Sequence, residues 1–284
     1  MTDGTRENAA LERLEGVVGG LGAVVVGFSG GADSALLAFT ARRRLGREAA
    51  ICVTAVSASL AHEELADCEK LAGEWDLDWR PVRTGEVDNE AYAVNAGDRC
   101  YYCKSELMSV LTPIAGETGA TAVLGVNLDD LADHRPGQRA AAERGARFPL
   151  VEAGLTKADV RAVSRRLGLR TADKPAAACL ASRVPYGTRV TFGVLEQVGA
   201  AEGALHRLGF DEVRVRHYGE LARLEIPLNR LGAVLEQREA IVGAVQATGY
   251  SYVTLDLEGL RSGNLNSALP AGTEPTASPV RGRT

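Results

Sequence analysis

Short apolar runs alternate with helix-favouring stretches along the first 170 residues of the chain. Most of these runs are rich in β-branched side chains and show no polar alternation, which is typical of strands buried on both faces of a parallel sheet. We expect strands at residues 24–26, 50–56, 79–82 and 121–125. We expect helices at residues 8–21, 34–44, 62–73, 104–118 and 156–167. This alternation predicts an α/β fold with a doubly wound parallel sheet.

The pattern changes after Thr188. Strands with alternating polar and apolar positions then lie between two helical stretches, so we expect a small α+β domain with an antiparallel sheet. Its predicted elements are a helix at 192–208, strands at 212–218 and 221–227, a helix at 229–246 and a strand at 251–257. The expected domains are therefore residues 1–184 and 185–269, followed by a disordered tail at 270–284 that is rich in Pro, Thr, Gly and Ser.

The first predicted strand leads through Ser29-Gly30-Gly31 into a helix that starts near Ser34. Glycines let the backbone pass close to a phosphate, and the first N–H groups of a helix attract anions. The hydroxyl groups of Ser29 and Ser34 add two donors to this predicted anion site. No lysine follows the glycines, so the segment is not the G-x-x-x-x-G-K-[ST] loop.

The pattern Ser29-Gly-Gly-x-Asp33-Ser34 resembles the PP-loop of the ATP pyrophosphatase superfamily. Members of that superfamily split ATP into AMP and pyrophosphate and thereby adenylate a carbonyl or carboxyl oxygen. The resemblance implies an adenine nucleotide alpha hydrolase-like fold, and it implies that Ser29, Gly30, Gly31, Asp33 and Ser34 hold ATP. The alternative is an ordinary glycine-containing turn between a strand and a helix.

Polar residues also follow two other predicted strands. Ser57 comes after the strand at 50–56, and Asn127, Asp129 and Asp130 come after the strand at 121–125. Strand carboxyl ends are where an open α/β sheet binds its ligand. Ser57 is therefore a candidate for nucleoside binding or for capping the next helix. The two aspartates are candidates for holding Mg²⁺ against ATP phosphates or, alternatively, for capping a helix.

Composition narrows the range of partners. The 284 residues carry a formal net charge of -5, so the chain shows no global electrostatic footprint for nucleic acid. No apolar run approaches the roughly 20 residues that span a bilayer, and the N-terminal residues lack an apolar secretory core. We expect a cytoplasmic protein that binds neither membrane nor nucleic acid.

Five cysteines, an odd number, argue against a disulfide framework. Cys52 and Cys68 lie in predicted core elements and read as small buried hydrophobic residues. Cys179 lies between Lys174 and Arg183, and neighbouring cations favour the nucleophilic thiolate. Cys100 and Cys103 form a C-x-x-C pair. That pair fits zinc binding together with Cys179 and His134, a redox pair, or two unrelated buried thiols.

Several further motifs resemble the LarE family, over about residues 20–268. Members are ATP-dependent sulfur transferases of nickel-pincer nucleotide synthesis. The resemblance implies that the chain adenylates the carboxylates of pyridinium-3,5-biscarboxylic acid mononucleotide and converts them to thiocarboxylates. It adds Gly125, Asn127 and Asp129 to the nucleotide site. The motifs are Arg99–Lys104, Gly125–Asp130, His134–Gly137, Gly154–Lys157, Lys174–Arg183, Pro185–Gly187 and Arg261–Asn266.

The resemblance leaves two sulfur sources open. Some family members give up the sulfur of the cysteine that corresponds to Cys179 and keep dehydroalanine in its place. Others carry three cysteines and resemble enzymes whose [4Fe-4S] cluster has one iron without a protein ligand, where an extra sulfide binds. Cys100, Cys103 and Cys179 would be the cluster ligands here.

The substrate implied by the resemblance carries a phosphate, which suits the arginines of the C-terminal domain. Arg214 and Arg216 alternate with valines, so both guanidinium groups lie on one face of the predicted strand. With Arg183 and Arg261 they form a candidate phosphate clamp, whereas the alternative is a solvated charged face. Glu202 is a candidate for proton transfer or for pairing with an arginine.

The family resemblance further implies a homo-oligomer and raises a downstream nickel-inserting protein as a candidate partner.

Three other interpretations of the sequence compete with this one. A PP-loop enzyme of tRNA thiolation would carry a basic surface or an added RNA-binding domain, and the sequence indicates neither. Ammonia-dependent amidation assigns nothing to the three cysteines. A nucleotide-binding module without turnover would keep the sheet and lose the chemistry.

Overall fold

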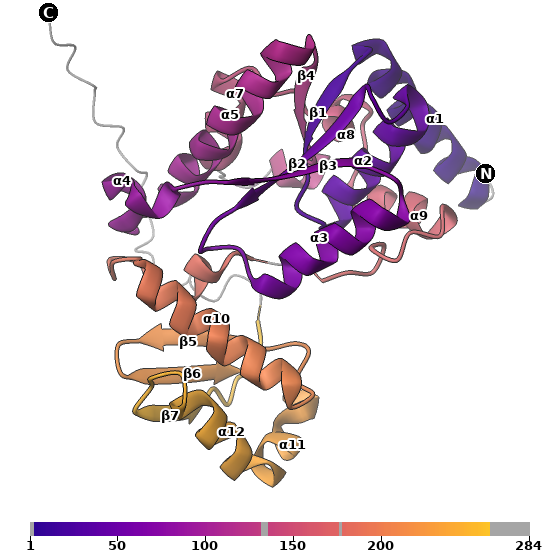
Figure 1. Ribbon diagram of the computed structural model, residues 1–284. Helices are drawn as coiled ribbons and strands as arrows, with labels where there is room; N and C mark the ends of the chain where they lie inside the picture. The colour runs from indigo at the N-terminus through magenta and orange to yellow at the C-terminus, as the bar shows by residue number, and fades with distance from the viewer. Residues whose placement is uncertain (1–2, 132–135, 176–177, 262–284) are drawn as a thin grey trace, which may run out of the picture. The chain divides into compact units, whose positions relative to one another are not determined.

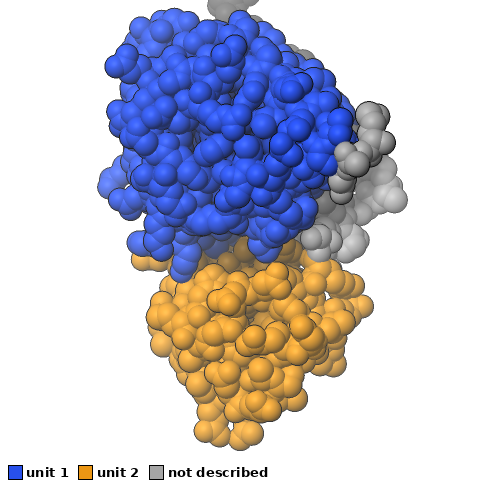
Figure 2. Space-filling view, turned by 90° about the vertical axis from the view of Figure 1, so that its right-hand side faces the viewer, with its two compact units in different colours: residues 1–93, 100–180 blue, residues 94–99, 181–284 orange. Residues whose placement is uncertain are grey.

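The structure is a computed structural model that describes residues 3–131, 136–175 and 178–261. Contacts between residues group Met1–Ala93 with Cys100–Leu180 as unit 1, and Val94–Arg99 with Ala181–Thr284 as unit 2 (Figure 2). The expected tail at 270–284 lies outside the described residues. Among the helices of the described ranges, none has the length and apolar composition needed to cross a membrane.

Unit 1 contains a four-stranded parallel sheet, which confirms the expected fold class (Figure 1). Its strands are β1 (Val24–Gly27), β2 (Ala50–Val56), β3 (Asp78–Arg83) and β4 (Thr121–Leu124). Their order in the sheet is β3-β2-β1-β4. The chain thus adds β2 and β3 on one side of β1 and then returns to place β4 on the other side. The point between β1 and β4 is where a doubly wound sheet opens a crevice for ligand.

Two helical layers cover this sheet. The first contains α1 (Asp3–Leu21), α2 (Ala32–Leu45), α3 (His62–Glu74), α8 (Pro149–Glu152) and α9 (Lys157–Arg166). The second contains α5 (Arg99–Thr118) and α7 (Pro136–Glu143). Val24 and Val26 pack into the first layer, while Val25 packs into the second with Met108 and Leu111. Burial on both faces explains why the first strand is continuously apolar in sequence.

Short elements complete unit 1, and several of them were not expected from the sequence. They are η1 (Glu86–Asp88), α4 (Glu90–Ala93), α6 (Leu128–Leu131) and η2 (Leu180–Arg183). The last of these continues past the end of unit 1 at Leu180. Helices of four residues or fewer carry too little periodicity to be recognised from a pattern alone.

Unit 2 contains a three-stranded sheet in the order β5-β6-β7, with β5 (Arg214–Tyr218), β6 (Leu221–Glu225) and β7 (Tyr252–Leu255). The expected all-antiparallel pairing is wrong, because β5 and β6 pair antiparallel but β6 and β7 pair parallel. The hairpin at Gly219 forces the first pairing, whereas the helical crossover between β6 and β7 permits the second.

Helices of unit 2 pack on one face of its sheet. They are α10 (Phe192–Arg207), α11 (Leu231–Glu236) and α12 (Arg238–Gln246), with η3 (Leu228–Arg230) before α11. The single helix expected at 229–246 is interrupted at Gln237, whose φ of -102° and ψ of 17° depart from helical values. Val215, Ala222 and Leu224 form the core with α10 and α12 residues such as Leu205 and Ile241.

A titratable pair is buried in this core. His217 Nδ1 lies 3.1 Å from the Tyr250 hydroxyl, and both side chains are almost fully buried. Burial lowers the pKa of His217 and raises the pKa of Tyr250. Desolvation disfavours the charged form of each group, so the folded protein keeps His217 neutral.

We predict that acid destabilises unit 2 through His217. Because the folded pKa lies below the unfolded value of about 6.5, the unfolded state binds more protons as the pH falls through this range. The free energy of unfolding should therefore decrease between about pH 7.5 and about pH 5.5. Thermal melts of His217→Gln should show a smaller decrease than the wild type. A His62→Gln control, at an exposed position, should keep the full decrease; an unchanged decrease in His217→Gln would contradict the prediction.

Candidate active site

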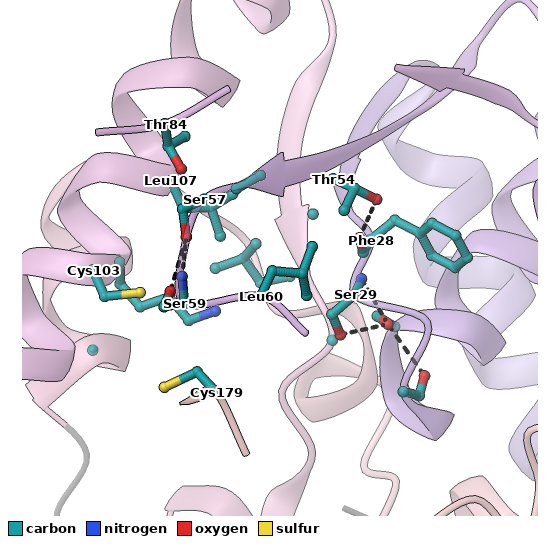
Figure 3. A pocket seen from close by; sticks show the side chains of 18 of the residues that line it. Phe28, Ser29, Thr54, Ser57, Ser59, Leu60, Thr84, Cys103, Leu107 and Cys179 are labelled. Carbon is teal, nitrogen blue, oxygen red and sulfur yellow. Dashed lines mark hydrogen bonds between the residues drawn. The ribbon is translucent and has the colours of Figure 1, made fainter. Parts of the chain in front are cut away.

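A cavity of about 360 Å³ opens at the carboxyl ends of the parallel strands in unit 1 (Figure 3). Residues after β1, β2 and β4 form its walls, together with α5 and the segment that holds Ala178 and Cys179. Its position at the β1/β4 reversal agrees with the general rule for ligand sites in open α/β sheets. The cavity therefore lies where the strand-end residues were expected to meet a ligand.

Hydrogen bonds of its two serines hold the Ser29–Ser34 loop together. Ser34 Oγ accepts a hydrogen bond from Ser29 N at 3.2 Å, donates to Gly31 O at 3.1 Å and lies 3.1 Å from Ser29 Oγ. Gly30 has a φ of +69°, and a Cβ there would lie 2.9 Å from Cys68 Sγ. A glycine is needed at this position because both its backbone conformation and the space around it exclude a side chain.

The start of α2 is left open toward the cavity. Gly31 is the N-cap residue and makes no side-chain capping bond. Gly31 O accepts the first hydrogen bond of the helix, from Ala35 N. The backbone N–H groups of the residues between Gly31 and Ala35 therefore have no partner within the helix. Such groups, next to the Ser29 hydroxyl, suit the phosphates of a nucleotide.

Gly125 and Asn127 bring the end of β4 against this loop. A Cβ on Gly125 would lie 2.7 Å from Ser34 N, so only glycine permits the approach. Asn127 is fully buried, and its Nδ2 donates to Asp33 Oδ1 at 2.8 Å. Its Oδ1 accepts from Asp129 N and Asp130 N. Asn127 therefore caps α6, and Asp130 Oδ2 accepts in return from Asn127 N at 3.2 Å, so Asp130 takes part in the cap as the alternative interpretation expected.

The carboxylates near the Ser29–Ser34 loop have different surroundings. Asp129 Oδ2 accepts from Lys157 N at 2.6 Å, at the start of α9. Burial raises the pKa of Asp33, against the Asn127 hydrogen bond that lowers it, and the negative charge of Asp130 raises it further. Asp33 and Asp130 are thus close enough to repel one another. A divalent cation would relieve that repulsion, and Mg²⁺ commonly takes one or two carboxylates plus phosphate oxygens.

Ser57 lines the cavity and does not cap a helix. The N-cap of α3 is Ala61, which makes no side-chain capping bond. Instead, Ser57 Oγ donates to the Glu86 carboxylate. Glu86 lines the same cavity and was missed by the sequence analysis, although it follows the end of β3 as Ser57 follows β2. The strand-end argument, applied to that third strand, would have found it.

The C-x-x-C pair lies on the first turn of α5, because this helix begins at Arg99 and not at the expected Lys104. Cys103 lines the cavity and Cys100 is exposed. Cys179 is exposed and lines the cavity too, and Figure 3 shows its sulfur at the same end as that of Cys103. Burial raises the pKa of Cys103 to about 12, and the charges of Cys179 and Cys100 contribute to the rise. The positive charge of Lys104 opposes this rise.

Three cysteine thiols are the kind of donor that a cluster with three cysteine ligands takes, and two of them, Cys103 and Cys179, line the cavity. Within residues 3–131, 136–175 and 178–261, however, no three His, Cys, Asp or Glu side chains are already arranged to hold a metal ion. The zinc interpretation also needed His134, which lies outside the described residues.

The two cations that flank Cys179 in sequence are held by carboxylates. Lys174 Nζ pairs with Glu64 Oε2 at 2.8 Å and with Asp67 Oδ2 at 2.7 Å. Arg183 pairs with Glu202 in unit 2 through two bonds, Nε to Oε1 at 2.8 Å and Nη2 to Oε2 at 3.0 Å. Their charges are thus largely compensated by these acids.

Glu202 connects this buried pair to the sheet of unit 2. Its Oε1 also accepts from Val215 N at 2.9 Å, so the carboxylate bonds to the edge of β5. Of the two candidate roles of Glu202, the geometry matches pairing with an arginine. Proton transfer by Glu202 stays a prediction.

Arg214 and Arg216 lie on one face of β5, where they pair in register with Glu225 and Arg223. Arg216 is only 3% exposed, which a solvated charged face does not explain. It donates to Ser182 O at 2.6 Å and to Glu225 Oε2 at 2.7 Å. Burial lowers the pKa of Arg214, and the positive charges of Arg183 and Arg216 lower it further.

Three guanidinium groups of unit 2 therefore lie near one another, and the carboxylates of Glu202 and Glu225 offset part of their charge. Arg261 joins them through its backbone, because Arg214 Nη1 donates to Arg261 O at 3.0 Å. The guanidinium of Arg261 bonds to Glu258. The rest of the expected motif at 262–266 lies outside the described residues.

Comparison with known proteins agrees with this geometry. A family model described as NAD synthase matches residues 12–93, which include the Ser29–Ser34 loop. The parallel sheet, the loop and this match define an ATP-dependent enzyme of the PP-loop class. The chain is 40% identical over 247 residues to the pyridinium-3,5-bisthiocarboxylic acid mononucleotide synthase of Lactiplantibacillus plantarum, covering 87% of this chain and 90% of that protein. The chain belongs to the LarE family.

Two uncharacterised proteins are also similar. One, from Synechocystis sp., is 45% identical over 262 residues, which is 91% of this chain and 97% of that protein. The other, from Methanocaldococcus jannaschii, is 25% identical over 240 residues, or 84% and 91% of the two chains. The similarity thus extends through both units.

We predict that Gly125→Ala disrupts nucleotide binding. The added methyl group would meet backbone atoms of Asp33 and Ser34, so the first turn of α2 must move. ATP affinity, measured by calorimetry, should fall by about tenfold or more. As a control, Gly116→Ala adds a methyl group that meets nothing within 4 Å and should leave ATP affinity unchanged. Wild-type affinity in Gly125→Ala would disprove the close approach.

Proposed function

We propose that the chain is an ATP-dependent sulfur transferase that converts the carboxylates of pyridinium-3,5-biscarboxylic acid mononucleotide into thiocarboxylates. The name of the Lactiplantibacillus relative and the shared family support this substrate. One arrangement carries the proposal: Cys103 and Cys179 line the same cavity as Ser29 and Ser34. A sulfur source and a phosphate-binding loop in a single cavity are what activation followed by sulfur transfer requires.

In this proposal a substrate carboxylate oxygen attacks the α-phosphorus of ATP, and pyrophosphate leaves. The Ser29–Ser34 loop binds the phosphates, and Asp33 and Asp130 would hold the Mg²⁺ that accompanies them. A sulfur nucleophile then attacks the acyl carbon, the acyl–oxygen bond breaks and AMP leaves. Adenylation is needed because a free carboxylate is a poor electrophile and has no leaving group.

We propose that Cys100, Cys103 and Cys179 hold a [4Fe-4S] cluster. Bound there, such a cluster would supply the sulfur to be transferred as an extra sulfide. Cys103 and Cys179 line one cavity, and Cys100 lies on the same first turn of α5 as Cys103, which supports this ligand set.

The second candidate source is Cys179 itself, supported by its exposure at the cavity wall. Its thiolate would form a thioester with the activated carboxyl group. Loss of the Cys179 α-proton with cleavage of the Cβ–S bond would then release the thiocarboxylate and leave dehydroalanine. Each chain would act once.

The group of Arg183, Arg214 and Arg216 is suited to a phosphate, and we assign it that function, with Arg261 beside it. We further propose that the chain works as a homo-oligomer in the cytoplasm, where thiols stay reduced, and that a nickel-inserting protein takes its product.

The activation step predicts substrate-dependent pyrophosphate release. Anaerobically purified protein given ATP and Mg²⁺ should release pyrophosphate only when the pyridinium dicarboxylate mononucleotide is present. A Ser34→Ala variant, which opens the loop, should lose most of this release. Nicotinic acid mononucleotide, with one carboxylate fewer, serves as the comparison compound. Absence of pyrophosphate release in the wild type would refute the proposed function.

The cluster and sacrificial routes predict different outcomes for Cys100→Ala. If a cluster supplies sulfur, the wild type contains iron and sulfide, its mass is unchanged after turnover, and Cys100→Ala loses thiocarboxylate formation. If Cys179 is consumed, the wild-type chain loses the elements of H₂S and Cys100→Ala stays active. Cys52→Ala, in the buried strand β2, is the matched control and should behave as the wild type in both cases.

A further inference from the structure

A buried carboxylate on the cavity wall has no part in the proposed reaction so far. Glu86 Oε1 accepts from Ser57 Oγ at 2.5 Å and from Ser59 Oγ at 2.7 Å, and Glu86 Oε2 accepts from Thr84 Oγ1 at 3.0 Å. All four residues line the cavity. We call them the Glu86 hub.

The hub places a carboxylate on the cavity wall. Its two serines also contact each other, with Ser57 Oγ 2.8 Å from Ser59 Oγ, and Ser57 Oγ accepts from Ser59 N at 3.2 Å, so the hydroxyl groups are held among themselves and around the carboxylate. Glu86 itself is 4% exposed. In the described part of the chain it forms no ion pair with a lysine, arginine or histidine. A buried carboxylate without a cationic partner is costly, which makes the wall receptive to a cation.

The hub lies at the sulfur end of the cavity. Glu86 and Cys103 both line this cavity. Ser59 O accepts from Leu180 N at 2.8 Å, next to Cys179. Figure 3 shows Ser57, Ser59 and Thr84 on the side of Cys103, with Ser29 and its hydrogen bonds on the other side.

We propose that the Glu86 hub binds the cationic ring of the substrate. This inference rests on the proposed function, because the pyridinium ring carries a fixed positive charge at every pH. The ring must also lie at the sulfur end, where its carboxyl group receives sulfur. The adenine of ATP is the competing occupant of the Glu86 hub, because its amino group can donate a hydrogen bond to the carboxylate. Adenine is neutral, however, and gains less than a cation from a buried carboxylate.

The test compares two ligands that differ only in ring charge. One is the pyridinium dicarboxylate mononucleotide, and the other is its analogue with a benzene ring in place of the pyridinium ring. Calorimetry on the full chain should show that the wild type binds the charged ring about tenfold more tightly or better. Glu86→Gln keeps the shape and removes the charge, so it should bind both ligands about equally.

Two variants serve as controls. Glu106→Gln removes a nearby carboxylate that bonds to Gly85 N and does not line the cavity, and it should keep the wild-type preference. Glu86→Asp retains the charge and should keep part of the preference. Thermal melts of each variant verify that it is folded before its binding is interpreted.

Three results would overturn the inference: no wild-type preference for the charged ring, an undiminished preference in Glu86→Gln, or equal weakening of both ligands in that variant. A loss of ATP affinity in Glu86→Gln, with ring preference intact, would assign the hub to adenine instead. Failure of the proposed function would give a different result: the wild type would release no pyrophosphate when the pyridinium compound is added.

Discussion

The site of unit 1 depends on the close approach of two backbones at the reversal of the sheet. Gly125, at the end of β4, packs so near Ser34 that no side chain fits between them. This contact brings Asn127 to Asp33 and sets the Ser29–Ser34 loop at the mouth of the crevice. The phosphate-binding loop is positioned by that approach, whereas Ser57 is held separately by Glu86. A glycine there is therefore a requirement of the tertiary structure.

A second constraint is that buried charged side chains need partners, and the two units provide these partners differently. In unit 2, Arg183 pairs with Glu202 through two bonds, and Arg216 pairs with Glu225. In unit 1, the Glu86 carboxylate has hydroxyl donors but no cation among the described residues. Compensated pairs fix structure, whereas a partly compensated charge on a cavity wall is available to a ligand.

Much of the fold could be predicted from local signals. Buried strands such as Val24–Gly27 are apolar throughout, and α9 begins with a capping box at Thr156 and Asp159, close to the start expected from sequence. The pairing of β7 could not be predicted, because strand direction depends on how a crossover packs. The functions of Asn127 and Ser57 were uncertain for the same reason, since their partners Asp33 and Glu86 are distant in sequence.

By itself the sequence determined the four strands and most of the longer helices of unit 1, the glycine loop and the cysteine motifs, because periodicity, turn chemistry and motif spacing are properties of neighbouring residues. Only the tertiary structure decided that Cys103 and Cys179 share a cavity with the loop, that Arg183 is held by Glu202, and that Glu86 faces the same space. These are contacts between residues far apart along the chain. The geometry of these contacts depends on the order of the strands in the sheet and on the packing of the helices, and no local sequence pattern encodes either.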